Sequence, residues 1–331
     1  MLDFAGKRWY YLGFSMIFFT IAAIALAIPP HLKAGIEFTS GSSFTFEFTD
    51  REVKQDDLRA AMASIGHGEA RIQGAGANTY LINTRELQGA PSLGGAEGPV
   101  PAGEIDQIQD ELTQRFGHIN RLDFSTVSST VSTEIARNAT FAVIAASLAI
   151  LVYISLAFRR LPRPFLFGAA AVLALLHDAF VILGLFSILG KLFNTEVDTG
   201  FITALLTVIG FSVHDTIVVF DRIREKVTHD PFIPFEEAVN ASLTETLARS
   251  LNTSFVVVLT VIALLLIGGV TIRNFLIVLL VGIISGTYSS IGIASQLLVA
   301  WERGDFGKFF RRLLGRQKAE PESESVEMEP A

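Results

Sequence analysis

The chain has 331 residues, of which 50% are hydrophobic, with a formal net charge of −7 and a mean hydropathy of +0.46. It contains no cysteine, which excludes disulfides and thiolate metal sites. No basic face matches a phosphate backbone, so a nucleic-acid partner is not expected. The apolar residues gather in long runs, whereas residues 30–137 and 302–331 are predicted to be soluble. We therefore expect a membrane protein with several spans.

Six apolar runs are each long enough to cross about 30 Å of hydrocarbon at a rise of about 1.5 Å per residue. They are Tyr10–Ile28, Asn138–Phe158, Phe165–Leu189, Thr199–Phe220, Leu251–Val270 and Phe275–Trp301. The first run could be a signal peptide, because Ala25-Leu26-Ala27 resembles an A-x-A cleavage site. Its 19 residues exceed the roughly 7–15 of a signal-peptide core, so we expect an uncleaved span within residues 1–29.

The short loops between the runs differ in basic charge, and this difference sets the orientation. One side carries fourteen basic residues: Lys7, Arg8, Arg159, Arg160, Arg163, Arg222, Arg224, Lys226, Arg303, Lys308, Arg311, Arg312, Arg316 and Lys318. The short loops of the other side carry only Lys191 and Arg273. Both termini are therefore predicted to be cytoplasmic, with residues 30–137 outside the cytoplasm.

The segment 30–137 has its own alternation of strand and helix patterns. In chain order these are a strand at 44–48, a helix at 53–65, strands at 69–74 and 78–85, a helix at 104–116 and a strand at 121–128. A Gly/Pro/Ala-rich loop is expected at 88–103. The order β-α-β-β-α-β predicts an α+β domain of the ferredoxin-like kind.

Residues 138–301 are predicted to form the remaining five spans, with a cytoplasmic amphipathic loop at 221–250. The tail at 302–331 is first basic and then acidic, and it is short of apolar residues, so we expect disorder there. The predicted fold class is an α-helical polytopic membrane protein with six transmembrane helices and one α+β ferredoxin-like domain.

The fourth run contains His214 and Asp215, and an Asp at the centre of a membrane helix costs at least about 2.5–3.5 kcal/mol. Helical spacing puts Asp215 on one face with Ser212 and Arg222. The same spacing gives His214 a second face, shared with Thr207, Gly210 and Asp221. An ionisable group that a membrane span retains indicates a transport path.

Arg249 lies at the entry of the fifth run and could meet Asp215 if the two spans are neighbours. A contact that opens and closes would be a proton switch, in which the Asp is ionised when paired and protonated when apart. The alternative is a static salt bridge between helices. Glu245, four residues before Arg249, is another possible helical partner for this arginine.

The third run carries His177 and Asp178, with Asp178 on the side of Ala171 and Ala174. These two groups could belong to the polar pathway, or they could be a hydrogen-bonded pair that only fixes packing. No metal-ligand spacing surrounds them, so neither a metal nor a cofactor is expected. The contexts of intramembrane aspartyl proteases are also missing, and we do not expect an enzyme.

The sixth run has small residues at fourfold spacing, which is typical of close contact between membrane helices. They are Gly282, Gly286, Ser290 and Ala294. We expect this stripe to be part of the scaffold.

Five ordered motifs resemble the SecF proteins of the SecD/SecF family, which are bacterial protein-export membrane proteins related to the resistance-nodulation-division (RND) transporters. The motifs are the segment Gly35–Ser42, Val127–Ala136, Leu176–Asp178, Gly210–Glu225 and Ser242–Ser254. The first departs from the family pattern, with Glu37 and Ser40 in place of Asp and Gly. His214 stands where relatives often have a residue that does not ionise.

The resemblance implies a multi-pass protein of the bacterial inner membrane with a periplasmic domain at 30–137. It implies a subunit that uses the proton-motive force to assist export of secretory proteins. A SecD chain, the SecYEG translocon, YajC and the translocating preproteins would be its partners. Asp215 and Arg249 carry over to the Asp and Arg of the family's proton path, and His214, Asp178 and His177 are further candidates.

Two other functions stay open on the sequence. The first is half of an RND-type exporter of small molecules, although such exporters usually have twelve spans in one chain. The second is a scaffold for translocon assembly that transports nothing, and such a scaffold would tolerate Asp215→Asn.

Overall fold

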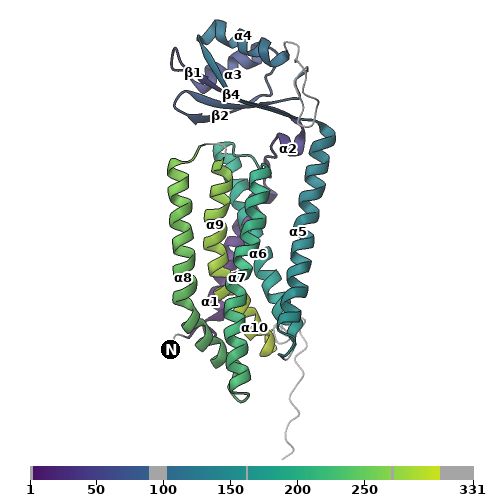
Figure 1. Cartoon of the computed structure of the whole chain (residues 1–331), viewed down its shortest axis with the longest axis vertical. Coiled ribbons are helices and arrows are strands. Elements are labelled where there is room, and N and C mark those ends of the chain that lie inside the picture. Colours follow the sequence, from purple (N-terminus) through teal and green to yellow (C-terminus); the bar gives the residue numbers. More distant parts are fainter. Residues whose placement is uncertain (1–2, 89–102, 162, 270–271, 306–331) are drawn as a thin grey trace, which may run out of the picture.

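The computed structural model describes residues 3–88, 103–161, 163–269 and 272–305. A small α+β domain sits at one end of a bundle of long helices (Figure 1). We call this end of the bundle the domain end and the opposite end the far end. Within the described residues, six helical segments are long and apolar enough to cross a membrane.

These six segments coincide with the six predicted spans and differ from them mainly at their ends. They are α1 (Arg8–Ala27), α5 (Ser129–Ala157), α6 (Pro164–Phe193), α7 (Thr199–His229), α8 (Phe235–Ile267) and the run Arg273–Glu302, in which α9 (Arg273–Ser289), the π-helix η2 (Ser290–Ala294) and α10 (Ser295–Glu302) follow one another. The expected tail beyond residue 305, and residues 89–102 of the expected loop at 88–103, lie outside the described residues.

The segment 221–250, expected as an amphipathic loop, is instead almost entirely helical. Helix α7 continues to His229 and α8 begins at Phe235, so that only five residues connect them. Ion pairs across this helical hairpin hold it together: Glu245 accepts from Lys226 at 2.5 Å and from Nε of Arg222 at 2.5 Å. The apolar pattern ends where charged residues begin, but the helices continue because these charges pair along and between them.

The α+β domain has the predicted β-α-β-β-α-β order. Its elements are β1 (Gly41–Phe48), α3 (Gln55–Ser64), β2 (Arg71–Gly76), β3 (Thr79–Thr84), α4 (Glu104–Phe116) and β4 (Ile119–Val127), preceded by the short helix α2 (Ile36–Thr39). The sheet order is β2-β3-β1-β4, and each neighbouring pair is antiparallel. Since β1 and β2 run parallel with β3 between them, this is the ferredoxin-like arrangement.

The core of this domain forms on one face of the sheet. Phe44, Phe46 and Phe48 alternate along β1 and are all buried against Leu58 of α3 and Leu112 of α4. Burial of each such side chain is worth about 1.5–3 kcal/mol. Helices α3 and α4 therefore cover the face away from the bundle, and the other face turns toward the bundle (Figure 1).

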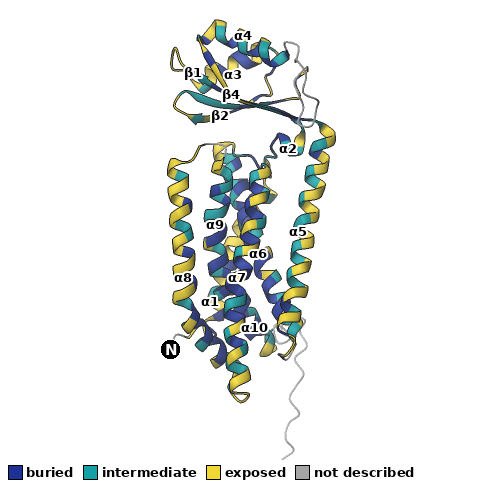
Figure 2. Ribbon diagram, viewed as in Figure 1, coloured by how far each residue is buried: buried dark blue, intermediate teal, exposed yellow. Residues whose placement is uncertain are grey.

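The bundle is most closely packed around α7 and α9, whereas α5 and α8 are largely exposed (Figure 2). Gly282 and Gly286 of α9 lie against α7, where an added Cβ would come within 2.3 Å of Val208 and 2.8 Å of Ser212. The small-residue stripe expected in the sixth span therefore does bring two helices into close contact.

Candidate functional site

Asp178 of α6 lies in the core of the bundle, where only 1% of its surface is exposed. Three serine hydroxyls donate to its carboxylate: Ser212 of α7 at 2.8 Å, Ser285 of α9 at 2.7 Å and Ser289 of α9 at 2.6 Å. Ser285 and Ser289 are one helical turn apart and so face the same way. We call Asp178 and these three serines the serine cage, and it ties α6, α7 and α9 together.

His177 stands beside the cage, with its Nδ1 atom 3.3 Å from Oδ1 of Asp178. Its Nε2 atom is buried and makes no hydrogen bond to any described residue. Asp178 is thus fully supplied with donors, as in the packing alternative that the sequence left open, while His177 keeps one ring nitrogen without a partner. A proton-path role for these two residues stays a prediction.

Asp215 of α7 is 3% exposed, and its Oδ2 atom has no hydrogen-bond partner among the described residues. It lies 16 residues from the first residue of α7, at a depth of about 24 Å from the domain end. Asp178 lies 15 residues before the end of α6, at a depth of about 22 Å. The two carboxyls therefore share one level of the bundle, and Ser212 lies one turn from Asp215 on the same helix.

The charges of His214 and of Arg249 on α8 both act on Asp215. Arg249 nevertheless forms no ion pair with Asp215 within 4 Å. Glu245, the alternative partner that the sequence offered, is instead engaged by Arg222 and Lys226. Within the described part of the chain, Arg249 has no ion-pair partner and is exposed. The arginine is therefore near the buried carboxyl and separate from it.

Ser250 was not singled out from the sequence, and it lies beside Asp215 at the α7–α8 interface. Its hydroxyl is buried and near enough to influence the Asp215 carboxyl, yet neither it nor Oδ2 of Asp215 has a hydrogen-bond partner at normal bonding distance among the described residues. One turn farther along α8, Ser254 and Thr287 of α9 bond to each other at 2.5 Å. A polar layer therefore extends from α6 through α7 and α9 to α8.

His214 points away from this layer. It is exposed on α7, as are Thr207, Gly210 and Asp221, the residues that the sequence placed on its face. The structure therefore brings Asp178, His177 and Asp215 into one interior layer, with Arg249 at its edge and His214 on the outer surface of the bundle.

The arrangement contains one satisfied and one unsatisfied acidic group. A buried polar atom without a partner costs about 1–3 kcal/mol, so the Asp215 site favours either a proton on the carboxyl or a donor that moves up to it. Arg249 and Ser250 are donors on α8 that lie near this carboxyl. The serine cage of Asp178 already has its donors and holds its three helices in register.

Ser285 and Ser289 were also missed from the sequence, as was the π-helix that follows them. The signal was present, since two serines four residues apart in an apolar span must share a face. What the sequence does not reveal is which helix that face meets. Serine also occurs in such spans bonded only to its own backbone, as Ser290 is to Thr287.

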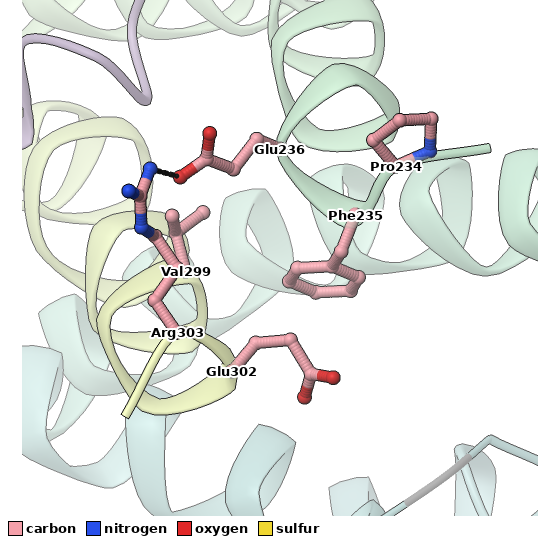
Figure 3. A pocket seen from close by; sticks show the side chains of 6 residues that line it. All are labelled: Pro234, Phe235, Glu236, Val299, Glu302 and Arg303. Atoms are coloured by element: carbon pink, nitrogen blue, oxygen red, sulfur yellow. Dashed lines mark hydrogen bonds and ion pairs between the residues drawn. The ribbon is translucent and has the colours of Figure 1, made fainter. Parts of the chain in front are cut away.

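A separate pocket of about 350 Å³ lies at the far end, between the start of α8 and the end of α10 (Figure 3). It is lined by Pro234, Phe235, Glu236, Val299, Glu302 and Arg303. The ion pair between Arg303 and Glu236 borders it (Figure 3). None of the residues of the polar layer lines this pocket.

Comparison with known proteins points to one family. The pattern of the family described as "Protein export membrane protein SecD/SecF, C-terminal" matches residues 107–304. The chain is 43% identical to a "Protein translocase subunit SecF" of Thermobaculum terrenum, over 94% of this chain and 98% of that protein. It is also 36% identical to a "Protein translocase subunit SecDF" of Bacillus subtilis, over 92% of this chain but only 39% of that longer one.

A solved structure has the same fold. The crystal structure of SecDF from Thermus thermophilus, described as a translocon-associated membrane protein, superposes with a TM-score of 0.76 at 31% identity. The match covers 91% of this chain and 39% of the SecDF chain.

Proposed function

Because this chain belongs to the SecF proteins of the SecD/SecF protein-export family, we propose that it couples the proton-motive force to protein export by the Sec translocase. One observation carries the coupling proposal. Asp215 is buried at the level of the serine cage with an unpartnered carboxylate oxygen, close to an arginine that has no ion-pair partner among the described residues. An acidic group and a basic group that lie near each other without pairing are the components of a switch.

In this proposal Asp215 carries a proton while Arg249 is apart from it, and it is ionised when Arg249 moves in. A proton crossing about 100 mV releases about 2.3 kcal/mol, enough to bias two arrangements of the helices. Ser250 offers a hydroxyl that could bond to the Asp215 carboxyl in either state. Asp178 and His177 lie at the same level and continue the path toward α6, and Ser212 connects their cage to the helix of Asp215.

The proposed location is the bacterial inner membrane, with both termini cytoplasmic. The far end of the bundle then faces the cytoplasm and the α+β domain faces the periplasm. The fourteen basic residues on one side against two on the other support this orientation.

The proposed partner within the membrane is a SecD chain. The Bacillus subtilis relative is named SecDF, and this chain matches 39% of its length, which leaves room for a SecD part. The exposed stripe Thr207, Gly210 and His214 on α7 is polar and small, so it suits contact with another helix better than contact with lipid. His214→Leu should reduce co-purification with SecD, whereas Tyr153→Leu, an exposed change on α5, should not.

SecYEG, YajC and translocating preproteins are the further partners that the family implies. A scaffold without transport is the competing function, and the satisfied cage of Asp178 is what a static scaffold would also contain.

The test is reconstitution of the full chain with its SecD partner and the translocon in proteoliposomes. Asp215→Asn should abolish both proton flux and the gradient-dependent part of export. Asp221→Asn is the matched control, because it makes the same change on the same helix at an exposed position. Export at the normal rate by the Asp215→Asn protein would refute the coupling and favour the scaffold.

A further inference from the structure

Three residues of the turn between α6 and α7 are bonded to the α+β domain or its linker: Asn194, Glu196 and Val197. Asn194 ends α6 in a left-handed conformation, and its carbonyl accepts from Gln73 of β2 at 2.6 Å. The amide of Val197 donates to the backbone carbonyl of Lys33 at 2.7 Å, and the carbonyl of Val197 accepts from the amide of Gly35 at 2.8 Å. The turn is therefore part of the helical bundle by sequence and is also hydrogen-bonded to the α+β domain and its linker.

Glu196 is the charged centre of this junction, and it is 5% exposed. Its carboxylate accepts from Arg71 of β2 at 3.1 Å and from Asn83 of β3 at 2.7 Å. The same nitrogen of Arg71 also donates to the carbonyl of Ala34 at 3.1 Å. Two adjacent strands of the sheet thus grip one carboxylate that belongs to the bundle, and we call Glu196, Arg71 and Asn83 the clamp.

The clamp connects directly to the start of α7. Asp198, two residues after Glu196, caps this helix by accepting from the amide of Phe201 at 2.7 Å. Asn274 of α9 holds both acidic residues, donating to the carbonyl of Glu196 at 3.1 Å and to Asp198 Oδ2 at 2.9 Å. From Thr199 onward α7 is one uninterrupted helix that contains Asp215.

This geometry leaves little freedom between Asp215 and the sheet. A helix transmits an axial shift or a tilt along its length, and Glu196 is attached to its capped end within two residues. Arg71 and Asn83, which hold Glu196, project from β2 and β3, and these two strands are paired with each other in the antiparallel sheet. A displacement of α7 must therefore either move the sheet or break the clamp.

Resting on the proposed function, we propose that Glu196 is the positioning residue that transmits movement of α7 to the α+β domain. The clamp holds the edge strand β2 and its neighbour β3 to the start of α7, while β4 on the opposite edge leads into α5. Movement of α7 relative to α5 then tilts the sheet. Proton chemistry at Asp215 and movement of the domain are two separable events joined at Glu196.

The test uses the full chain reconstituted with its SecD partner, with proton flux and export measured in the same vesicles. Glu196→Gln and Arg71→Gln should each leave proton flux unchanged and lower gradient-dependent export about 5-fold or more. Arg59→Gln is the matched control, because Arg59 is an exposed arginine of the same domain that pairs with Asp56 away from the clamp.

A second measurement follows the domain itself. The chain has no cysteine, so Asp110→Cys on α4 and Leu266→Cys on α8 allow specific spin labels on the two parts, and both sites are exposed. A pH gradient should shift the label-to-label distance with an intact clamp and leave it unchanged with Glu196→Gln.

The outcomes separate this inference from the proposed function. If Glu196→Gln keeps both export and the distance shift, the clamp does not transmit. If Glu196→Gln lowers proton flux together with export at normal protein abundance, Glu196 supports the proton site and the inference is overturned. If Asp215→Asn leaves flux and export intact, the coupling function fails, while the label distances still decide whether the clamp links the two parts.

Discussion

Arg71 of the α+β domain and Glu196 of the helical bundle form an ion pair at 3.1 Å, and Glu196 is the buried member. The pair joins residues 125 positions apart in the chain and connects the two parts of the molecule. Its energetic and mechanical contributions can be tested separately.

Removing the arginine leaves Asn83 as the one side-chain donor to the buried Glu196 carboxylate among the residues that the structure describes. Because the side chain of Arg71 is 49% exposed, solvent screening limits the loss to about 1 kcal/mol. Arg71→Ala should therefore speed hydrogen exchange at the Val197 amide about 5-fold, as local opening becomes easier. Arg59→Ala is the control, and equal exchange in the two variants would show that the ion pair does not hold the turn.

The serine cage should be a source of bundle stability. Ser289→Ala removes one of three hydroxyl donors from a buried carboxylate, and the expected loss is about 1.5–3 kcal/mol. Thermal unfolding in detergent measures it. Ser290→Ala is the matched control, because within the described part of the chain that hydroxyl bonds only to the backbone carbonyl of Thr287. An equally small effect of both substitutions would show that Asp178 does not depend on these donors.

Helices α7 and α9 can pack closely because position 282 of α9 is a glycine, which has no side chain. An added Cβ at Gly282 would lie 2.3 Å from Val208, so Gly282→Ala should destabilise the bundle by about 1–3 kcal/mol. Val208→Ala should restore part of the loss by making room. Gly210→Ala makes the same change on α7 with nothing within 4 Å, and it should be neutral or slightly stabilising in the isolated chain.

Glu37 gives the junction a pH dependence. Burial raises the pKa of this carboxyl, partly offset by a backbone hydrogen bond, and the nearby carboxylates of Asp198 and Glu196 raise it further. A raised pKa means that the folded protein holds the proton more tightly than the unfolded chain. The resulting stability is full at low pH and is lost as the pH rises through the folded-state pKa.

Glu37→Gln, which imitates the protonated carboxyl, should therefore raise the melting temperature at about pH 8 and change little at about pH 4.5. Glu69→Gln should instead lower the melting temperature at about pH 8, because a backbone hydrogen bond lowers the pKa of Glu69 in the folded protein. Stability from Glu69 is present at neutral pH and lost as the pH falls. Equal melting temperatures of Glu37→Gln and the unmodified protein at every pH would show that Glu37 does not make the stability depend on pH.

Several of the candidate site residues can be recognised in the sequence because their signal is local. Asp215 and Asp178 stand out since a carboxyl in an apolar helix is expensive wherever it occurs. Arg249 is noticeable as a basic residue at the start of a span, and helical spacing places His214 on a different face from Asp215. None of these inferences requires knowledge of which helices touch. That the face of His214 is the outer surface of the bundle is seen only in the structure.

Other site features depend on contacts that no local pattern encodes. The apolar pattern indicates where α7 and α8 enter the membrane, but it does not indicate that Glu245 bonds Arg222 and Lys226 in place of Arg249. Ser250 was overlooked because a serine near the end of a span has no distinguishing spacing. Glu196 was overlooked because, in a short loop, it resembles any solvated carboxylate.

The six spans, the β-α-β-β-α-β order and the two intramembrane acids can all be recognised without coordinates, because hydrophobic length and side-chain periodicity are properties of single segments. The packing of the helices, in contrast, sets which donors reach each acid: serines from two other helices bond to Asp178, while one oxygen of Asp215 has no partner among the described residues. The same packing buries Glu196 against side chains of two adjacent strands, β2 and β3. The physical reason is that hydrogen bonding and burial depend on which surfaces meet, and surfaces distant in the chain meet only when the whole bundle has packed.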